Sequence, residues 1–86
     1  MVPFNRVSVN QYLDMCKTNI NPNAKNDPEI FTKMRQVIES DPWMNERYPH
    51  LIAGLGVLER IELTVPERHC FLGTMCYEIA IDTHHM

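Results

Sequence analysis

The residues best suited to metal binding gather in the last third of the chain. Cys70, Cys76, His84 and His85, with His69 nearby, carry the thiols and imidazoles that hold zinc in proteins. Their spacing does not match the usual zinc motifs, in which two cysteines stand about two to four residues apart and two histidines about three to five. We expect the segment between the two cysteines to be an extended strand, which would separate them by about 20 Å. The sequence therefore predicts no metal ion, no disulfide between these cysteines and no other cofactor.

The same residue types, with Cys16 and His50 added, are also those of cysteine nucleophiles activated by histidine. No recognisable local signature of such a nucleophile surrounds any of the three cysteines. Gly54 and Gly56 form only a fragment of a glycine-rich phosphate-binding loop. We therefore expect a protein that is not an enzyme. The alternative is a domain that binds a small molecule or nucleotide, or has a minor catalytic activity, through its His and Cys groups.

A short segment in the middle of the chain instead has the composition of a protein interface. Trp43, Arg47 and Tyr48 lie close together in sequence, and these three residue types are the ones most enriched at interaction hot spots. Pro42 and Pro49 border the segment and limit its backbone freedom. We predict that these three side chains bind a partner protein. The competing interpretation is that Trp43 fills the core of a small domain.

Length and composition limit the class of protein. The 86 residues carry a formal charge of −3 and are 44% hydrophobic, which predicts one globular domain over residues 1–86 and argues against a disordered chain. The acidic charge makes binding to nucleic acid or to an anionic membrane unexpected. No segment has the length of a membrane span or the core of a signal peptide. Because an odd number of cysteines is typical of reduced thiols, we expect a cytoplasmic protein.

Two helices are predicted in the first half of the chain. Ser8-Val9-Asn10-Gln11 has the spacing of a capping box. Apolar residues recur at helical intervals after it, which predicts a helix over about residues 9–18. Asp27 and Pro28 have the types of an N-cap and a first helical residue, and they predict a second helix over about residues 28–40.

Between the second helix and the end of the chain we first expect short turns. Asp41 and Pro42 repeat a helix-start signal, but only a short turn is expected to follow them as far as Tyr48. Another turn is expected after that, until Gly54 and Gly56 interrupt it.

The last thirty residues change from helical to alternating periodicity. Residues 57–65 and 71–82 both carry apolar side chains mainly at odd positions, the pattern of half-buried strands. Joined by a loop over residues 66–70, they predict an antiparallel hairpin in which Val65 faces Phe71 and both apolar sets share one face. A lone hairpin is marginally stable. The expected fold is therefore α+β, with two N-terminal helices packed on a C-terminal antiparallel β-hairpin or small sheet.

The predicted hairpin has a second face that is too apolar for solvent. Leu58 and Leu72 would lie on this face, and the chain's own N-terminus around Phe4, a second subunit or a target protein would cover part of it. The two open strand edges would add unpaired backbone groups. We therefore predict self-association as a symmetric homodimer that covers Leu58 and Leu72.

These patterns favour a small non-enzymatic interaction module, such as an inhibitor, adaptor or accessory factor, that acts by binding the surface of a partner protein. A chain this short needs nearly all of its residues for one small core. Its sequence also contains no set of residues with the spacing of a known catalytic motif. Short compact chains of this kind are common among phage and viral accessory proteins, and we expect such a source.

Overall fold

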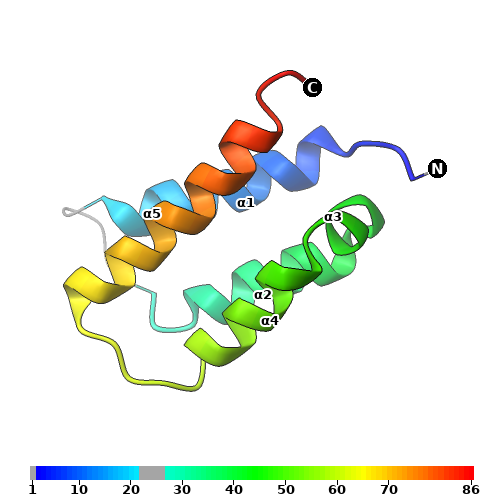
Figure 1. Ribbon diagram of the computed structural model, residues 1–86. Coiled ribbons are helices and arrows are strands. Elements are labelled where there is room, and N and C mark those ends of the chain that lie inside the picture. The colour runs from blue at the N-terminus through cyan, green and yellow to red at the C-terminus, as the bar shows by residue number, and fades with distance from the viewer. Residues whose placement is uncertain (1, 22–26) are drawn as a thin grey trace.

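Five helices follow one another along residues 2–21 and 27–86, the part of the chain that the computed structural model describes (Figure 1). They are α1 (Arg6–Ile20), α2 (Ile30–Ser40), α3 (Pro42–Arg47), α4 (Pro49–Leu58) and α5 (Val65–Asp82). No strand is present over these residues. The predicted α+β class is therefore wrong, because α4, a connecting segment and α5 take the place of the hairpin.

The helices form two antiparallel pairs that share one core. In one pair α1 packs against α5, and in the other α2 packs against α4 (Figure 1). Contacts between α1 and α2 join the pairs, and α3 connects the end of α2 to the start of α4. The two ends of the chain lie at the same end of the molecule (Figure 1), where the guanidinium of Arg6 donates a hydrogen bond to the backbone carbonyl of Met86.

A capping box starts α5 at a position where the sequence suggested a strand. The Thr64 hydroxyl accepts a hydrogen bond from the Glu67 backbone N–H at 3.3 Å, and the Glu67 carboxylate accepts one from the Thr64 N–H at 2.9 Å. This reciprocal arrangement satisfies two N–H groups that a helix otherwise leaves without partners. The Thr-x-x-Glu spacing was present in the sequence, and it favours a helix over a strand.

Burial along α5 follows the helical period. Leu72, Met75 and Ile79 are buried at intervals of three and four residues. Tyr77 and Ile81, odd-numbered residues that the hairpin would have placed in the core, are 68% and 56% exposed. The alternation of apolar residues in this segment therefore does not reflect a strand. The buried face of the helix also contains apolar residues at even positions, such as Leu72.

The segment between α4 and α5 was expected to belong to the first strand. It begins with Glu59, whose carboxylate accepts hydrogen bonds from the Thr32 hydroxyl at 2.7 Å and from Arg35 Nε at 3.1 Å. These contacts attach the end of α4 to α2. The predicted pairing of Val65 with Phe71 does not occur, since both residues lie on α5.

The first two predicted helices are present, but their starting residues differ. The side chain of Asn5 accepts two backbone hydrogen bonds and caps α1, so Ser8 lies in the first turn and is not the N-cap. Before α2, the Asp27 carboxylate accepts a hydrogen bond from the Glu29 N–H at 2.9 Å, and the helix begins at Ile30.

The segment predicted as two turns is helical as well. Asp41 caps α3 by accepting a hydrogen bond from the Met44 N–H at 3.3 Å, and both α3 and α4 begin with a proline. Gly54 and Gly56 lie inside α4 and do not interrupt it. Packing of α4 against α2 offsets the low helix propensity of the two glycines.

All five helices contribute to the core, together with Tyr48 between α3 and α4. Its buried apolar residues are Val9, Tyr12, Cys16, Ile30, Phe31, Met34, Ile38, Met44, Tyr48, Leu51, Leu55, Leu58, Leu72, Met75 and Ile79.

Candidate protein-binding surface

Trp43 lies at the centre of a small aromatic cluster on α3. Its ring meets that of Phe4 edge to face, with 4.8 Å between centroids, and meets that of Tyr48 in the same way at 5.8 Å. Such geometry is favoured between aromatic rings. Trp43 is half-buried and packs against the core without being part of it. The structure therefore places one side of the indole in the protein and leaves another accessible.

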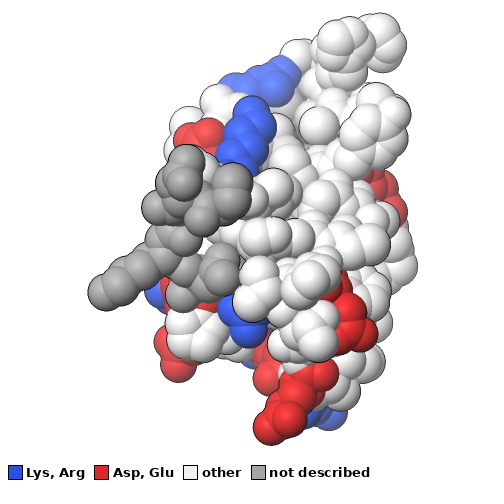
Figure 2. All heavy atoms as spheres, turned by 90° about the vertical axis from the view of Figure 1, so that its left-hand side faces the viewer, with Lys and Arg blue, Asp and Glu red and all other residues white. Residues whose placement is uncertain are grey.

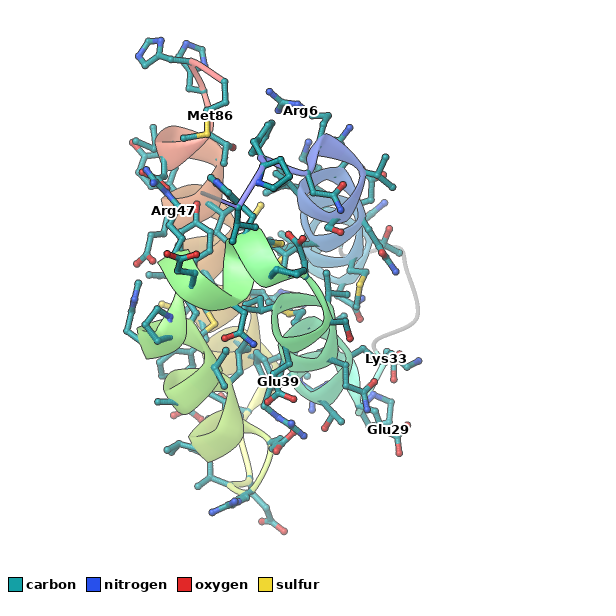
Figure 3. The ribbon with its side chains drawn as sticks, turned by 90° about the vertical axis from the view of Figure 1, so that its right-hand side faces the viewer. Arg6, Glu29, Lys33, Glu39, Arg47 and Met86 are labelled. Carbon is teal, nitrogen blue, oxygen red and sulfur yellow. The ribbon has the colours of Figure 1, made fainter. Side chains whose placement is uncertain are left out.

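Arg47 lies over the Trp43 ring, with 5.2 Å between the guanidinium carbon and the ring centroid. The same guanidinium donates two hydrogen bonds to Asp82 at the end of α5, from Nε at 2.6 Å and from Nη2 at 3.0 Å. Figure 3 shows Arg47 beside the C-terminal end of α5. A planar guanidinium held at two points has a defined orientation. Asp82 therefore fixes the position of Arg47 on the indole.

Tyr48 completes this arrangement from inside the protein. Its side chain is buried, and its hydroxyl donates a hydrogen bond to Asp82 Oδ2 at 2.5 Å. Burial, together with the neighbouring Asp82 carboxylate, raises the pKa of the Tyr48 phenol. Hydrogen bonds from Arg47, and then from Tyr48, lower the pKa of Asp82 to about 2. Asp82 is therefore a carboxylate at neutral pH and orients both neighbours.

A hollow of about 380 Å³ opens beside the indole, lined by Val2, Trp43, Glu46 and Arg47. We refer to these four residues as the Trp43 surface. It combines an apolar floor with an acceptor and a donor at its edge, which is the composition of a site for a protruding side chain of another protein.

A second polar contact adjoins this region. His50 Nε2 lies 2.6 Å from Glu78 Oε2, which links the start of α4 to α5. Both side chains are largely exposed. They line a shallow hollow of about 320 Å³ together with Arg47, Tyr48 and Asp82.

The structure brings together the three residues that the sequence singled out for partner binding. Trp43 and Arg47 reach the surface, whereas Tyr48 is only 3% exposed and supports them from below. Asp82, which accepts hydrogen bonds from Arg47 and Tyr48, is a site residue that the sequence patterns do not indicate. No local signal pointed to it, because it lies thirty-five residues from Arg47 in the sequence.

Leu58 and Leu72 are core residues, with 7% and 0% exposure. The hairpin face on which they were expected to lie does not exist, so the proposed dimer interface at these residues loses its basis. Self-association of the chain through other residues stays a prediction.

The cysteines and histidines are distributed differently from the strand-based expectation. Cys70 and Cys76 lie on one helix, about 9 Å apart along its axis and not about 20 Å. Cys76 lies near Cys16 of α1, and burial, helped by this neighbour, raises the pKa of the Cys16 thiol. The buried hydroxyl of Tyr12 has no hydrogen-bond partner among the described residues.

Within residues 2–21 and 27–86, no three His, Cys, Asp or Glu side chains converge in a way that would hold a metal ion. Over the same residues, no helix combines the length and apolar character needed to cross a membrane. No family model, curated protein or solved structure matches the chain.

Proposed function

We propose that this chain is a small non-enzymatic module that binds a partner protein through the Trp43 surface. The observation that supports this best is the position of Arg47, which Asp82 holds by two hydrogen bonds over a partly exposed indole. Binding orders few additional side-chain torsions when the aromatic and charged groups are already held in place. Tryptophan and arginine in such an arrangement are the types that dominate interface energetics.

The composition of the Trp43 surface indicates what it would accept. Val2 and Trp43 offer apolar area for an aliphatic or aromatic side chain, while Glu46 and Arg47 offer an acceptor and a donor beside it. The partner is therefore expected to present an apolar side chain next to polar groups. Tyr48 acts as a positioning residue, since its hydroxyl holds Asp82 and does not face the partner.

The alternative, a catalytic domain that uses His and Cys groups, has one observation in its favour. His50 and Glu78 form an exposed pair of the kind that can relay a proton. Within the described part of the chain no thiol forms a hydrogen bond with this pair, and Cys16 is fully buried, so only Cys70 and Cys76 have thiols with access to solvent. We therefore favour the interaction module. We also propose that it works in the cytoplasm, where its three thiols stay reduced, and that it has a phage or viral source.

The experiment is affinity capture from cells of the native host, followed by a binding measurement with the captured protein. The test variants are Arg47→Ala and Glu46→Lys. Arg35→Ala is the matched control, because Arg35 also pairs with carboxylates but lies on α2 and faces Glu59. We expect wild type and Arg35→Ala to bind equally, and the two test variants to bind more weakly by about 2 kcal/mol.

Circular dichroism and thermal melts establish that each variant is folded before binding is compared. If all variants bind the captured protein equally, the Trp43 surface is not the binding site. If wild type captures no protein reproducibly, the partner-binding function itself is contradicted.

A further inference from the structure

A stripe of exposed, uncharged residues runs along the side of α5 that faces away from the other helices. Cys70, Thr74, Tyr77 and Ile81 recur on it at intervals of three and four residues, and all four are exposed. We refer to these residues as the outer α5 stripe. Figure 2 shows a broad uncharged area on this side of the molecule, with acidic and basic residues around it. A helix that exposes large Tyr and Ile side chains on an uncharged solvent side is typical of a second packing contact.

Residue size changes along this side of the helix. Small residues, namely Cys70, Gly73 and Thr74, occupy the N-terminal half, and the large residues Tyr77 and Ile81 occupy the C-terminal half. A Cβ atom added to Gly73 would meet no atom within 4 Å, so open space lies beside α5 at this point. The N-terminal half can therefore accept a bulky side chain that packs onto the helix from outside.

We propose that a second copy of the chain occupies the outer α5 stripe, with the two α5 helices antiparallel around a two-fold axis between residues 75 and 76. In this arrangement Tyr77 of each copy lies over Gly73 and Thr74 of the other, and Ile81 lies over Cys70. Because of the two-fold symmetry, the large residues of each copy pack against the small residues of the other. A parallel arrangement would place Tyr77 against Tyr77 and leave the small residues facing one another, which packs poorly.

Hydrogen-bonding groups favour the same orientation. Antiparallel pairing brings Glu67, in the first turn of α5, beside His84 and His85, which follow the last turn of α5 in the other copy. An imidazole N–H can donate to a carboxylate across this boundary. Glu78 and Asp82, which border the stripe, already pair with His50 and Arg47 within their own chain. Asp82, whose partner is a charged guanidinium, therefore adds little repulsion between the copies.

The size of the contact indicates a weak dimer. A helix of 18 residues is about 27 Å long, and two such helices paired along their length bury on the order of 1,000 Å² in total. That area is at the lower limit for a specific interface. We expect reversible dimers that form as the concentration rises through the micromolar range. This dimer does not involve the Trp43 surface, so its success or failure is independent of partner binding.

Sedimentation equilibrium over a wide concentration range tests the association. The average mass of wild type is expected to rise above the 10.1 kDa of the monomer, and Tyr77→Lys is expected to weaken the association by about tenfold or more. Val57→Lys is the matched control, because Val57 is 58% exposed on α4 and lies away from the stripe. It should associate like wild type.

The orientation is tested with one added cysteine. In Ile81→Cys, the antiparallel pairing places the new thiol beside Cys70 of the other copy. Oxidised glutathione, which accepts the two electrons and two protons, should convert this variant to a covalent dimer that peptide mapping identifies as linked between positions 70 and 81.

Wild type that stays monomeric at every concentration overturns the proposal, and then a different protein covers the stripe. The proposal is also overturned if Tyr77→Lys dimerises as well as wild type. A disulfide between the two Cys70 residues, formed in preference to the 70–81 link, would contradict the antiparallel orientation.

Discussion

Asp82, the last residue of α5, accepts hydrogen bonds from Arg47 and Tyr48, which lie at the junction of α3 and α4. This contact attaches the C-terminal end of α5 to the pair formed by α2 and α4. It also sets the geometry of the Trp43 surface, since the guanidinium that Asp82 holds is the one that covers the indole. Stability and the proposed binding site therefore depend on the same carboxylate.

We expect Asp82→Asn to remove a stabilising contribution that depends on pH. The pKa of Asp82 is lowered to about 2 in the folded chain, compared with about 3.9 for an unfolded aspartate. The stabilisation is therefore complete above the unfolded value and is lost as the pH falls towards 2. Because both side chains are partly exposed to solvent, it amounts to about 1 kcal/mol.

Urea unfolding of wild type and Asp82→Asn between neutral and acidic pH measures this effect. The difference in unfolding free energy should be largest near neutral pH and should close as Asp82 becomes protonated in wild type. Asp14→Asn, which alters an exposed carboxylate of α1, is the control. A difference that stays constant over the whole range would show that the ionised Asp82 is not stabilising.

The helix caps provide a second prediction. The sequence pattern indicates Ser8 as the N-cap of α1, whereas in the structure Asn5 caps this helix. Thr64→Ala removes the hydroxyl of the capping box at α5 and is expected to lower the unfolding free energy by about 1 kcal/mol. Ser8→Ala should change it much less, because Asn5 caps α1. Thermal or urea unfolding compares the two variants, and Thr64→Ser should behave like wild type. Equal losses in Ser8→Ala and Thr64→Ala would contradict the assigned start of α1.

Gly56→Ala is expected to stabilise the protein. A Cβ at this position meets no atom within 4 Å, and alanine is favoured over glycine inside a helix by about 1 kcal/mol. Gly54→Ala should gain less, since its Cβ would lie 3.4 Å from the end of the Met75 side chain. The midpoint of urea unfolding measures both. A loss of stability in Gly56→Ala would mean that residue 56 is not in a regular helix.

The three thiols are expected to react at different rates with a thiol reagent. Cys70 is exposed, Cys76 is half-buried and Cys16 is fully buried. Burial, helped by the nearby Cys76, also raises the pKa of Cys16 and so keeps it as the unreactive thiol. At concentrations low enough to keep the chain monomeric, we expect one fast phase, which Cys70→Ser removes. A fast phase that survives in Cys70→Ser would contradict the burial of the other two thiols.

Local patterns in the first half of the sequence were sufficient to find α1 and α2. Apolar residues recur in both at helical intervals, and Asp27 with Pro28 marks the region where α2 begins. Residues 57–82 are different, since their apolar residues are dense enough to match a period of two and a period of 3.6 at once. The capping pair Thr64 and Glu67 favoured a helix, but the alternation of apolar residues alone could not distinguish a helix from a strand.

For the candidate site, the sequence by itself determined that three residue types suited to partner binding, Trp43, Arg47 and Tyr48, lie within one short segment. Only the tertiary structure decided which of these side chains faces solvent and that Asp82 accepts hydrogen bonds from Arg47 and Tyr48. It also decided that Leu58 and Leu72 are in the core. The physical reason is that sequence periodicity depends on neighbours within one element. The contact of Asp82 with Arg47, in contrast, depends on how α5 lies against the rest of the bundle, and this follows from the packing of all helices together.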